Sequence, residues 1–373
     1  MRKFLIQLLI FTSPLTICLG YQSFILWRSK ENFNTIDKLI TGKEKYLIGY
    51  KHEKNYHYVK WAYLNENEKK DIWALGSSRV LQFRDKMFDS SFYNVGYTIE
   101  SINDFRTFLK SIPEAKHPKY IIIALDQWMF NLAWEKLTSK ATVNSWQNSF
   151  SIFPSLTDIY PFYKDFYKGK YPLKTLLRDN PILKIGLNAT FNNTGFRNDG
   201  SMYYGGQIAK LLTNDKRAAD YKYSNTFERI KKGNRRFEYG KSVNEKALVE
   251  LNELLKYCKE HQIEVVGFLP PFADMVFSKL IETNHYDYMK EIYSKVKPIF
   301  YNYKYEMYDF SRVSLCNSND SETIDGFHGG ELTYQKMLIN MMDSGSILNR
   351  VTNIERLKSD LAKNKNNYII YDY

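Results

Sequence analysis

The stretch DIWALGSSRV, residues 71–80, decides the fold class of this chain. Its short apolar run, 72–75, leads into glycine, two serines and an arginine, which is typical of a buried strand that ends in a polar turn. Four later apolar runs also end in turn-forming or polar residues: 92–95 before Gly96, 120–125 before Asp126, 263–269 before Pro270 and 306–310 before Ser311. The intervening segments are long enough for crossover helices, notably 101–111 and 243–261. We therefore expect an α/β protein with a doubly wound parallel sheet of about five strands, whose ligand binds beyond the carboxyl ends of the strands.

The composition favours a packed protein and excludes several classes. Of the 373 residues, 44% are hydrophobic and 16% aromatic, which is enough apolar area for a core through most of the length. The net charge of +12 comes from scattered Lys and Arg without a basic run that alternates with aromatic residues, so we expect no nucleic-acid partner. No CxxC motif or Cys/His cluster is present, and we expect neither a metal nor a cofactor. Cys258 and Cys316 can pair only if the fold brings their Cα atoms within about 7 Å.

Residues 4–27, FLIQLLIFTSPLTICLGYQSFILW, contain no charged side chain. A stretch of this length crosses the roughly 30 Å hydrocarbon core of a bilayer as one helix, which Pro14 is expected to kink. Arg2 and Lys3 favour a cytoplasmic N-terminus. We expect a single-pass protein of the cell membrane with its main domain extracytoplasmic and the lipid bilayer as a partner. A cleaved signal peptide is the alternative, but no small-x-small site follows the apolar stretch.

The rest of the chain divides into three expected parts: a polar connector over 28–70, the α/β domain over 71–348 and a loosely attached tail over 349–373. Within the α/β domain, residues 131–244 have an aromatic, Lys-rich pattern that predicts a large insertion. The insertion contains GFRNDGSMYYGG, residues 195–206, whose glycines indicate a tight exposed loop. There Arg197 and Asp199 are expected either to form a structural ion pair or to contact the substrate.

Three residues have the types that serine-dependent acyl transfer needs. A serine hydroxyl is a weak nucleophile, so it needs a base to take its proton and an acid to orient that base. Ser78 follows a strand in a Gly-x-Ser turn, and Asp325 and His328 stand three residues apart in DGFH, just before an expected helix. Ser77 is the alternative nucleophile, but the Gly-x-Ser register favours Ser78. Taken singly, each of these short patterns also occurs by chance, so the prediction rests on their order.

That order resembles the SGNH (GDSL-like) hydrolase superfamily: GSSR after the first strand, NVG after the second and a late DxxH before the last helix. The likeness extends to membrane-anchored envelope proteins of the teichoic acid D-alanylation and alginate acetylation types. It implies a flavodoxin-like, SGNH-type sheet with Ser78 as nucleophile, His328 as base and Asp325 as orienting acid. The backbone amides of Ser78 and Gly96 are then expected in the oxyanion hole.

The chain departs from this pattern at the third block, where the superfamily offers an asparagine and this sequence has Asp126 and Gln127. An ionised Asp126 would repel an oxyanion. Either Gln127 is the donor, or Asp126 is protonated or turned toward another group, or catalysis is weakened. Arg79 is expected to neutralise an anionic substrate or to lock the turn by pairing with a carboxylate. Asn94 is expected to serve the turn before Gly96 rather than a ligand.

The resemblance implies a membrane-anchored serine esterase or O-acyltransferase that acts on a cell-envelope glycan or polymer. A membrane acyltransferase is a candidate partner. The sequence does not separate hydrolysis from transfer. The alternative is a catalytically inactive SGNH-like envelope protein that binds a glycan or a membrane partner through the same cleft, and Asp126 motivates it.

Overall fold

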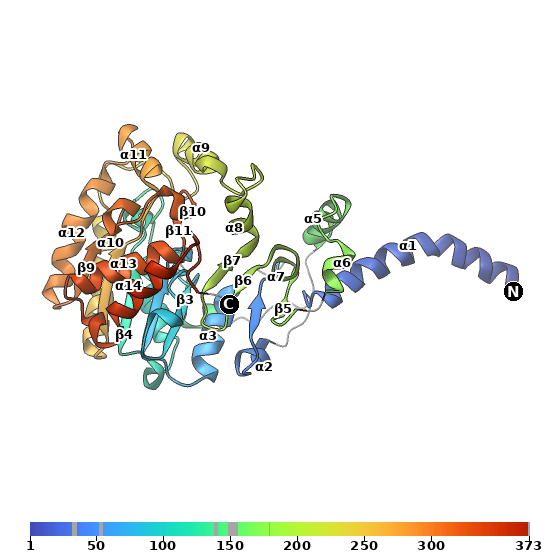
Figure 1. Cartoon of the computed structure of the whole chain (residues 1–373), viewed down its shortest axis with the longest axis horizontal. Coiled ribbons are helices and arrows are strands. Elements are labelled where there is room, and N and C mark those ends of the chain that lie inside the picture. The colour runs from blue at the N-terminus through green and yellow to red at the C-terminus, as the bar shows by residue number, and fades with distance from the viewer. Residues whose placement is uncertain (32–35, 52–54, 138–140, 148–155, 179, 372–373) are drawn as a thin grey trace. The chain divides into compact units, whose positions relative to one another are not determined.

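The computed structural model describes residues 1–31, 36–51, 55–137, 141–147, 156–178 and 180–371 (Figure 1). The chain divides into two compact units. The first contains Met1–Asn55, Ser149–Asn198 and Tyr203–Gly206, and the second contains Tyr56–Asn148, Asp199–Met202 and Gln207–Tyr373.

The second unit is built on a five-stranded parallel sheet of order β3-β2-β4-β8-β9. Its strands are the five expected apolar runs: β2 (Ile72–Gly76), β3 (Phe92–Gly96), β4 (Tyr120–Ala124), β8 (Glu264–Leu269) and β9 (Glu306–Asp309). The strand that comes first in the chain lies second from the edge, which is the 2-1-3-4-5 order of a doubly wound sheet. The sequence prediction of an α/β protein with a five-stranded parallel sheet is confirmed.

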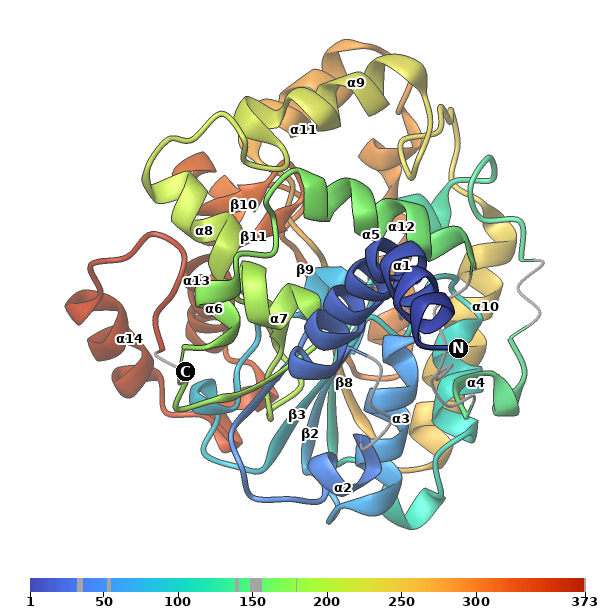
Figure 2. The same cartoon turned by 90° about the vertical axis from the view of Figure 1, so that its right-hand side faces the viewer.

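Helices pack on both faces of this sheet. Figure 2 shows α13 (Glu331–Asp343) and α14 (Ile354–Lys363) on one side of the strands and α4 (Asp104–Lys110) and α10 (Glu245–Glu260) on the other. Successive strand residues point to opposite faces. Trp73 and Leu75 therefore join the apolar cluster of α4, α10 and α12 (Tyr288–Asn302), whereas Ile72 and Ala74 join that of α13 and α14. Burial on both faces explains why the strands appear in the sequence as continuous apolar runs.

Close helix packing depends on one glycine in β8. A Cβ atom on Gly267 would lie 2.4 Å from the Phe300 ring of α12, so only glycine allows this approach. Helix α10, which matches the helix expected over 243–261, begins at a capping residue. The Asn244 side chain accepts a hydrogen bond from the Lys246 amide.

The shorter elements of the second unit connect the strands to the helices. They are α3 (Tyr56–Glu66), α9 (Ser224–Lys232), α11 (Asp274–Glu282), the hairpin β10 (Thr323–Asp325) and β11 (His328–Gly329), and the 3₁₀ helices η1 (Ser78–Val80), η2 (Asp85–Met87), η3 (Glu114–Lys116), η4 (Gln127–Phe130), η5 (Val143–Trp146), η6 (Tyr221–Tyr223), η7 (Val313–Cys316), η8 (Asp320–Glu322) and η9 (Ile347–Arg350). Helix α8 (Gly205–Leu212) is shared between the two units.

The first unit contains a small four-stranded sheet of order β5-β1-β6-β7. Its elements are α1 (Arg2–Arg28), α2 (Ile36–Ile40), β1 (Tyr46–Ile48), α5 (Leu156–Tyr167), α6 (Leu173–Leu176), β5 (Leu183–Ile185), α7 (Leu187–Asn192), β6 (Thr194–Phe196) and β7 (Met202–Tyr204). Parts of the segments expected as a connector and as an insertion thus belong to this unit. Helix α3 of the connector and residues 207–244 of the insertion belong to the second unit. Three-residue strands are too short to give an alternating pattern, so the sequence did not reveal them.

Helix α1 is bent by 53° between its parts Arg2–Pro14 and Leu19–Arg28. Within the described part of the chain, no single straight helix has the length and apolar composition to cross a membrane, whereas these two parts together have both. The bend begins at Pro14, which lacks the amide proton of a helical hydrogen bond and clashes with the preceding turn.

The C-terminal segment is firmly attached, contrary to the expectation of a loose tail. Leu357 of α14 is fully buried in the cluster of α13. The Glu331 amide donates to the carbonyl oxygen of Tyr368, and the Glu331 carboxylate accepts hydrogen bonds from the amides of Ile370 and Tyr371.

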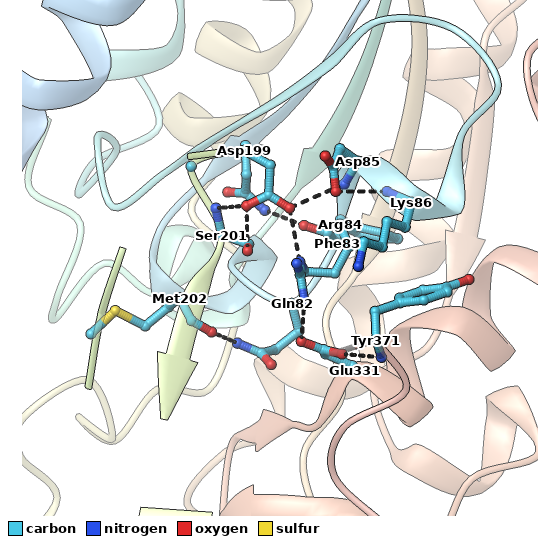
Figure 3. A network of polar contacts seen from close by, with 12 residues as sticks. Gln82, Phe83, Arg84, Asp85, Lys86, Asp199, Ser201, Met202, Glu331 and Tyr371 are labelled. Atoms are coloured by element: carbon cyan, nitrogen blue, oxygen red, sulfur yellow. Dashed lines mark hydrogen bonds and ion pairs between the residues drawn. The ribbon is translucent and has the colours of Figure 1, made fainter. Parts of the chain in front are cut away.

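A buried ion-pair network joins this tail to the loop after β2 (Figure 3). The Arg84 guanidinium lies 2.8 Å from the Asp199 carboxylate and 2.8 Å from that of Glu331. Asp199 also accepts hydrogen bonds from the amides of Asp85 and Ser201. Burial and the adjacent charge of Asp199 raise the pKa of Asp85 to about 6.

Replacing Arg84 with methionine removes the guanidinium that pairs with the buried Asp199 and Glu331 carboxylates. We expect the free energy of unfolding to fall by about 3–5 kcal/mol, the usual cost of breaking a buried ion pair. Arg106→Met, which removes a partly exposed pair with Glu250, is the control and should cost less than about 1 kcal/mol. Denaturant unfolding of the full chain in detergent measures both losses, and equal losses would contradict the role of the network.

A buried lysine also supports this region. Lys60 of α3 is fully buried, and its ammonium donates to the carbonyl oxygen of Asn94 at 3.0 Å and to that of Gly200. Burial lowers the pKa of Lys60 to about 7, although the charge of Asp199 opposes this shift.

The lowered pKa of Lys60 predicts a pH dependence of stability. Because the unfolded chain retains this proton up to about pH 10.4, folding is favoured as the pH rises from 7 toward that value. The free energy of unfolding of the wild type, minus that of Lys60→Met, should rise by at least about 1 kcal/mol between pH 7 and 10 and stay flat below pH 6. Urea titrations at several pH values measure this difference, and a constant difference would refute the prediction.

Candidate active site

Ser78 lies where β2 turns into η1. Gly76, the last residue of β2, packs closely against Ala124 of β4. A Cβ atom at position 76 would lie 3.2 Å from the Cβ atom of Ala124, so a larger residue would crowd this contact. The Ser77 hydroxyl accepts a hydrogen bond from the Arg79 amide and caps η1, whereas Ser78 is the first residue of the turn. Ser77 is buried and Ser78 is half-buried. The local structure therefore presents the hydroxyl of Ser78.

Asp325 and His328 lie at the tight loop between β10 and β11. The Asp325 carboxylate accepts hydrogen bonds from the amides of Phe327 and His328, at 3.0 and 2.9 Å, and these bonds fix the loop. The same carboxylate lies 2.8 Å from His328 Nδ1, and His328 Nε2 lies 2.9 Å from Ser78 Oγ. The three residues expected to form the triad are thus within hydrogen-bond reach in the expected order. Their positions are separated in the sequence but meet beyond the strand ends.

The electrostatics of the loop favour an ionised Asp325. Burial by itself raises the pKa of this carboxyl, but the charge of His328 and the hydrogen bonds from His328 and the two amides outweigh burial and lower it. An ionised carboxylate at Nδ1 holds the proton of the neutral imidazole on that nitrogen. Nε2 is then the lone-pair acceptor that faces the serine hydroxyl.

The carboxylate of Asp220, which the sequence did not mark as a site residue, also stabilises the loop between β10 and β11. Asp220 accepts hydrogen bonds from the Gly326 amide at 3.0 Å and from the Thr226 hydroxyl at 2.6 Å. A Cβ atom on Gly326 would lie 2.7 Å from that hydroxyl, so α9 packs directly on the loop. Asp220 lies in the expected insertion, where no periodic or motif signal marks it.

Arg79 is fully buried and all three of its guanidinium nitrogens are occupied. They donate to the carbonyl oxygen of Phe327 at 3.0 Å, to Gln127 Oε1 at 2.6 Å and to the carbonyl oxygen of Pro270 at 2.7 Å. The guanidinium also stacks on the Phe272 ring, with 4.4 Å between Cζ and the ring centroid. Of the two expected roles, this geometry supports the lock on the turn, because the guanidinium is fully buried and each of its nitrogens already donates to a protein acceptor.

The expected oxyanion donors do not all face the triad. The Gly96 amide donates to Asn94 Oδ1 at 2.9 Å, in a local turn that the short asparagine side chain favours. The Gln127 amide donates to the Pro270 carbonyl oxygen, and its own oxygen accepts from Arg79. Gly96 and Gln127 are therefore held in structural bonds, contrary to the expectation. The Ser78 amide remains as a donor because it opens η1, where amides lack a partner within the helix.

Asp126 is turned toward the buried arginine. Its carboxylate is fully buried, and Oδ1 lies 3.5 Å from Arg79 Nη1. Burial raises the pKa of Asp126, and the charge of Arg79 opposes that rise. Of the alternatives left by the sequence, orientation toward another group fits this geometry, and protonation fits the raised pKa.

Arg197 and Asp199 each have a described contact within their own unit. Asp199 is ion-paired with Arg84, as described above, and the Arg197 guanidinium lies 4.7 Å from the centroid of the Tyr203 ring. Arg84 precedes Asp199 by 115 positions in the chain, so no local pattern in the sequence marks this ion pair.

No metal site is apparent in the described residues, because no group of three or more His, Cys, Asp or Glu side chains there is arranged to hold an ion. Cys258 and Cys316 are both buried free thiols, so the pairing that the sequence left open does not form. No protein-family model matches the chain, and no curated protein matches it. The geometry of the site therefore carries the functional inference.

Arg79→Lys tests the lock directly. A single ammonium cannot occupy the three acceptor positions in the fixed geometry of a guanidinium, so buried acceptors lose their donors. We expect the free energy of unfolding to fall by about 2–4 kcal/mol, measured with urea. Arg356→Lys, on the surface beside Asp89, is the control and should be nearly neutral. A neutral Arg79→Lys would remove the structural role assigned to this side chain.

Proposed function

We propose that this chain is a serine esterase or O-acyltransferase that forms an acyl-enzyme on Ser78. The observation that carries the proposal is the continuous chain of contacts from Ser78 Oγ to His328 Nε2, at 2.9 Å, and from His328 Nδ1 to the Asp325 carboxylate, at 2.8 Å. The half-buried site also leaves the histidine partly accessible, with 14% of its side chain exposed.

The chemistry follows from these contacts. Ser78 Oγ attacks the acyl carbonyl carbon while its proton passes to His328 Nε2, and the Asp325 carboxylate stabilises the resulting imidazolium. The carbonyl oxygen takes the electron pair, and the Ser78 amide donates to it. The tetrahedral intermediate then expels the alcohol oxygen, which receives the proton from Nε2. Water gives hydrolysis of the acyl-enzyme, and an acceptor hydroxyl gives transfer.

The order of motifs supports placing the site in the SGNH (GDSL-like) hydrolase class. GSSR follows β2, NVG ends β3, and DGFH precedes α13. On the same resemblance, we propose a cell-envelope glycan or polymer as the substrate, with a membrane acyltransferase as a candidate partner.

We also propose that α1 anchors the chain in a membrane, with the second unit outside the cytoplasm. Apolar side chains of α1 are strongly exposed, for example 84% for Phe11 and 68% for Leu9. An exposed apolar stretch of this kind is stable in a lipid environment rather than in water. The bend at Pro14 is compatible with a membrane helix, where prolines are tolerated.

A non-catalytic envelope module is the second candidate function. The specific observation in its favour is that the Gly96 amide and the Gln127 side chain are held in structural bonds. A site with one oxyanion donor loses much of the transition-state stabilisation that esterases use. Such a module would bind a glycan or a membrane partner at the same strand ends.

Covalent labelling separates the two functions. We expect a fluorophosphonate probe to label the full chain in detergent, and we expect Ser78→Ala and His328→Ala to abolish labelling, because the first removes the nucleophile and the second its base. Ser77→Ala is the matched control. Its buried hydroxyl caps η1 and takes no part in the contacts among Ser78, His328 and Asp325, so labelling should persist. No labelling of the folded wild type, or labelling that survives Ser78→Ala, would contradict the enzyme proposal and favour the module.

A further inference from the structure

Two arginines near the triad form no ion pair within the part of the chain that the structure describes. Arg229 lies in α9, and Arg236 lies in the loop that follows it; both side chains are half-buried. Neither guanidinium has a hydrogen bond in those residues, and Arg229 Nε is shielded from solvent as well. The charge of Arg236 does act on the buried Asp126 carboxyl, where it opposes the rise in pKa that burial causes. Guanidinium donors that have no protein partner are available to an anionic ligand.

Both arginines are stacked on aromatic rings that belong to the site. Arg229 Cζ lies 5.5 Å from the centroid of the Phe327 ring, and that ring lies 4.4 Å from the imidazole of His328. Arg236 Cζ lies 5.2 Å from the Trp128 ring, which follows Asp126 and Gln127 in η4. Stacking engages the flat face of a guanidinium and leaves the N–H groups at its edge free to bind an oxyanion in a bidentate manner.

Two other arginines of the same unit, Arg79 and Arg84, have donors that are bonded to protein acceptors. The Arg79 guanidinium is stacked on Phe272, and its nitrogens are also bonded to three acceptors. Arg84 binds two carboxylates. Arg79 and Arg84 thus donate to protein acceptors, whereas the contacts that the structure describes for Arg229 and Arg236 are with aromatic rings.

The backbone conformation at position 236 is one that arginine adopts at a cost. Arg235 and Arg236 have positive φ angles of 53° and 78°, in the left-handed region that glycine and asparagine adopt at lower cost. The turn by itself therefore does not favour arginine. The surrounding segment, residues 224–241, has six basic and two acidic residues, which gives this side of the site a positive potential.

We propose that Arg229 and Arg236 bind an anionic group, a phosphate or a carboxylate, of the molecule whose acyl group is transferred at Ser78. The acyl-transfer part rests on the proposed function, whereas anion binding itself does not. Arg79 Nη1 lies 3.5 Å from the Asp126 carboxyl, whereas Arg236 makes no ion pair with it in the described residues, so the donors of Arg236 remain available to a ligand. The positive segment also attracts such a ligand from a distance, which raises its rate of association.

The test measures binding without turnover. Three aryl acetates with the same acyl group and a para carboxamide, carboxylate or phosphate are titrated by calorimetry into full-length Ser78→Ala in detergent. We expect an anionic ester to bind about tenfold more tightly than the neutral one, since one charge-assisted contact is worth about this factor. The carboxylate and phosphate esters distinguish the two sources of negative charge.

The arginine variants locate the binding. In the Ser78→Ala background, Arg229→Gln and Arg236→Gln should each weaken binding of the anionic ester by about tenfold and leave the neutral ester within about twofold. Arg235→Gln, the exposed neighbour with a similar backbone conformation, should change neither. Arg236→Lys should restore part of the affinity, which shows that charge and not folding is responsible.

Equal affinities for the three esters, absence of anion binding, or equal losses in Arg235→Gln would each overturn the inference. These outcomes are separable from failure of the proposed function. A chain that is labelled by the fluorophosphonate but does not prefer the anionic esters contradicts only the anion site. A chain that prefers them but is not labelled contradicts only the acyl-enzyme.

Discussion

The guanidinium of Arg79 holds together the strand ends on which the site depends. It connects the turn after β2 to Gln127 after β4, to Pro270 after β8 and to Phe327 in the loop of His328. Parallel strands bring these segments to one edge of the sheet but do not fix their relative heights. The planar guanidinium, with its donors at fixed positions, sets the relative positions of these segments. Ser78, which precedes Arg79, is therefore held within hydrogen-bond distance of His328.

The position of Arg79 also explains why Gln127 does not face the triad. Its side-chain oxygen accepts a hydrogen bond from Arg79 and its side-chain amide donates to the Pro270 carbonyl oxygen. The carboxyl of Asp126, at the end of β4, lies 3.5 Å from the same guanidinium and so belongs with the contacts that hold the turn. In the proposed reaction, the amide of Ser78 is therefore the donor to the oxyanion.

The sequence was sufficient to predict those features of the fold and of the candidate site that are local or periodic. The five strands were recognisable because burial on both faces makes them continuous apolar runs, and Asp325 and His328 because one tight loop contains both. It missed interactions between distant segments, such as Asp220 with Gly326, because no pattern in one chain encodes a contact over 106 residues. It also misjudged Gly96, whose amide Asn94 occupies two residues away. Side-chain competition of this kind depends on geometry rather than residue type.

If His328 activates Ser78 as a nucleophile, the serine should be acylated by a simple activated ester. This can be measured by mass spectrometry of the full chain, quenched with acid after mixing with excess p-nitrophenyl acetate. We expect one acetyl group on the peptide that contains Ser78, and none on that peptide in His328→Ala. Acetylation confined to surface lysines, or equal modification of Ser78 in both proteins, would show that His328 does not activate this serine.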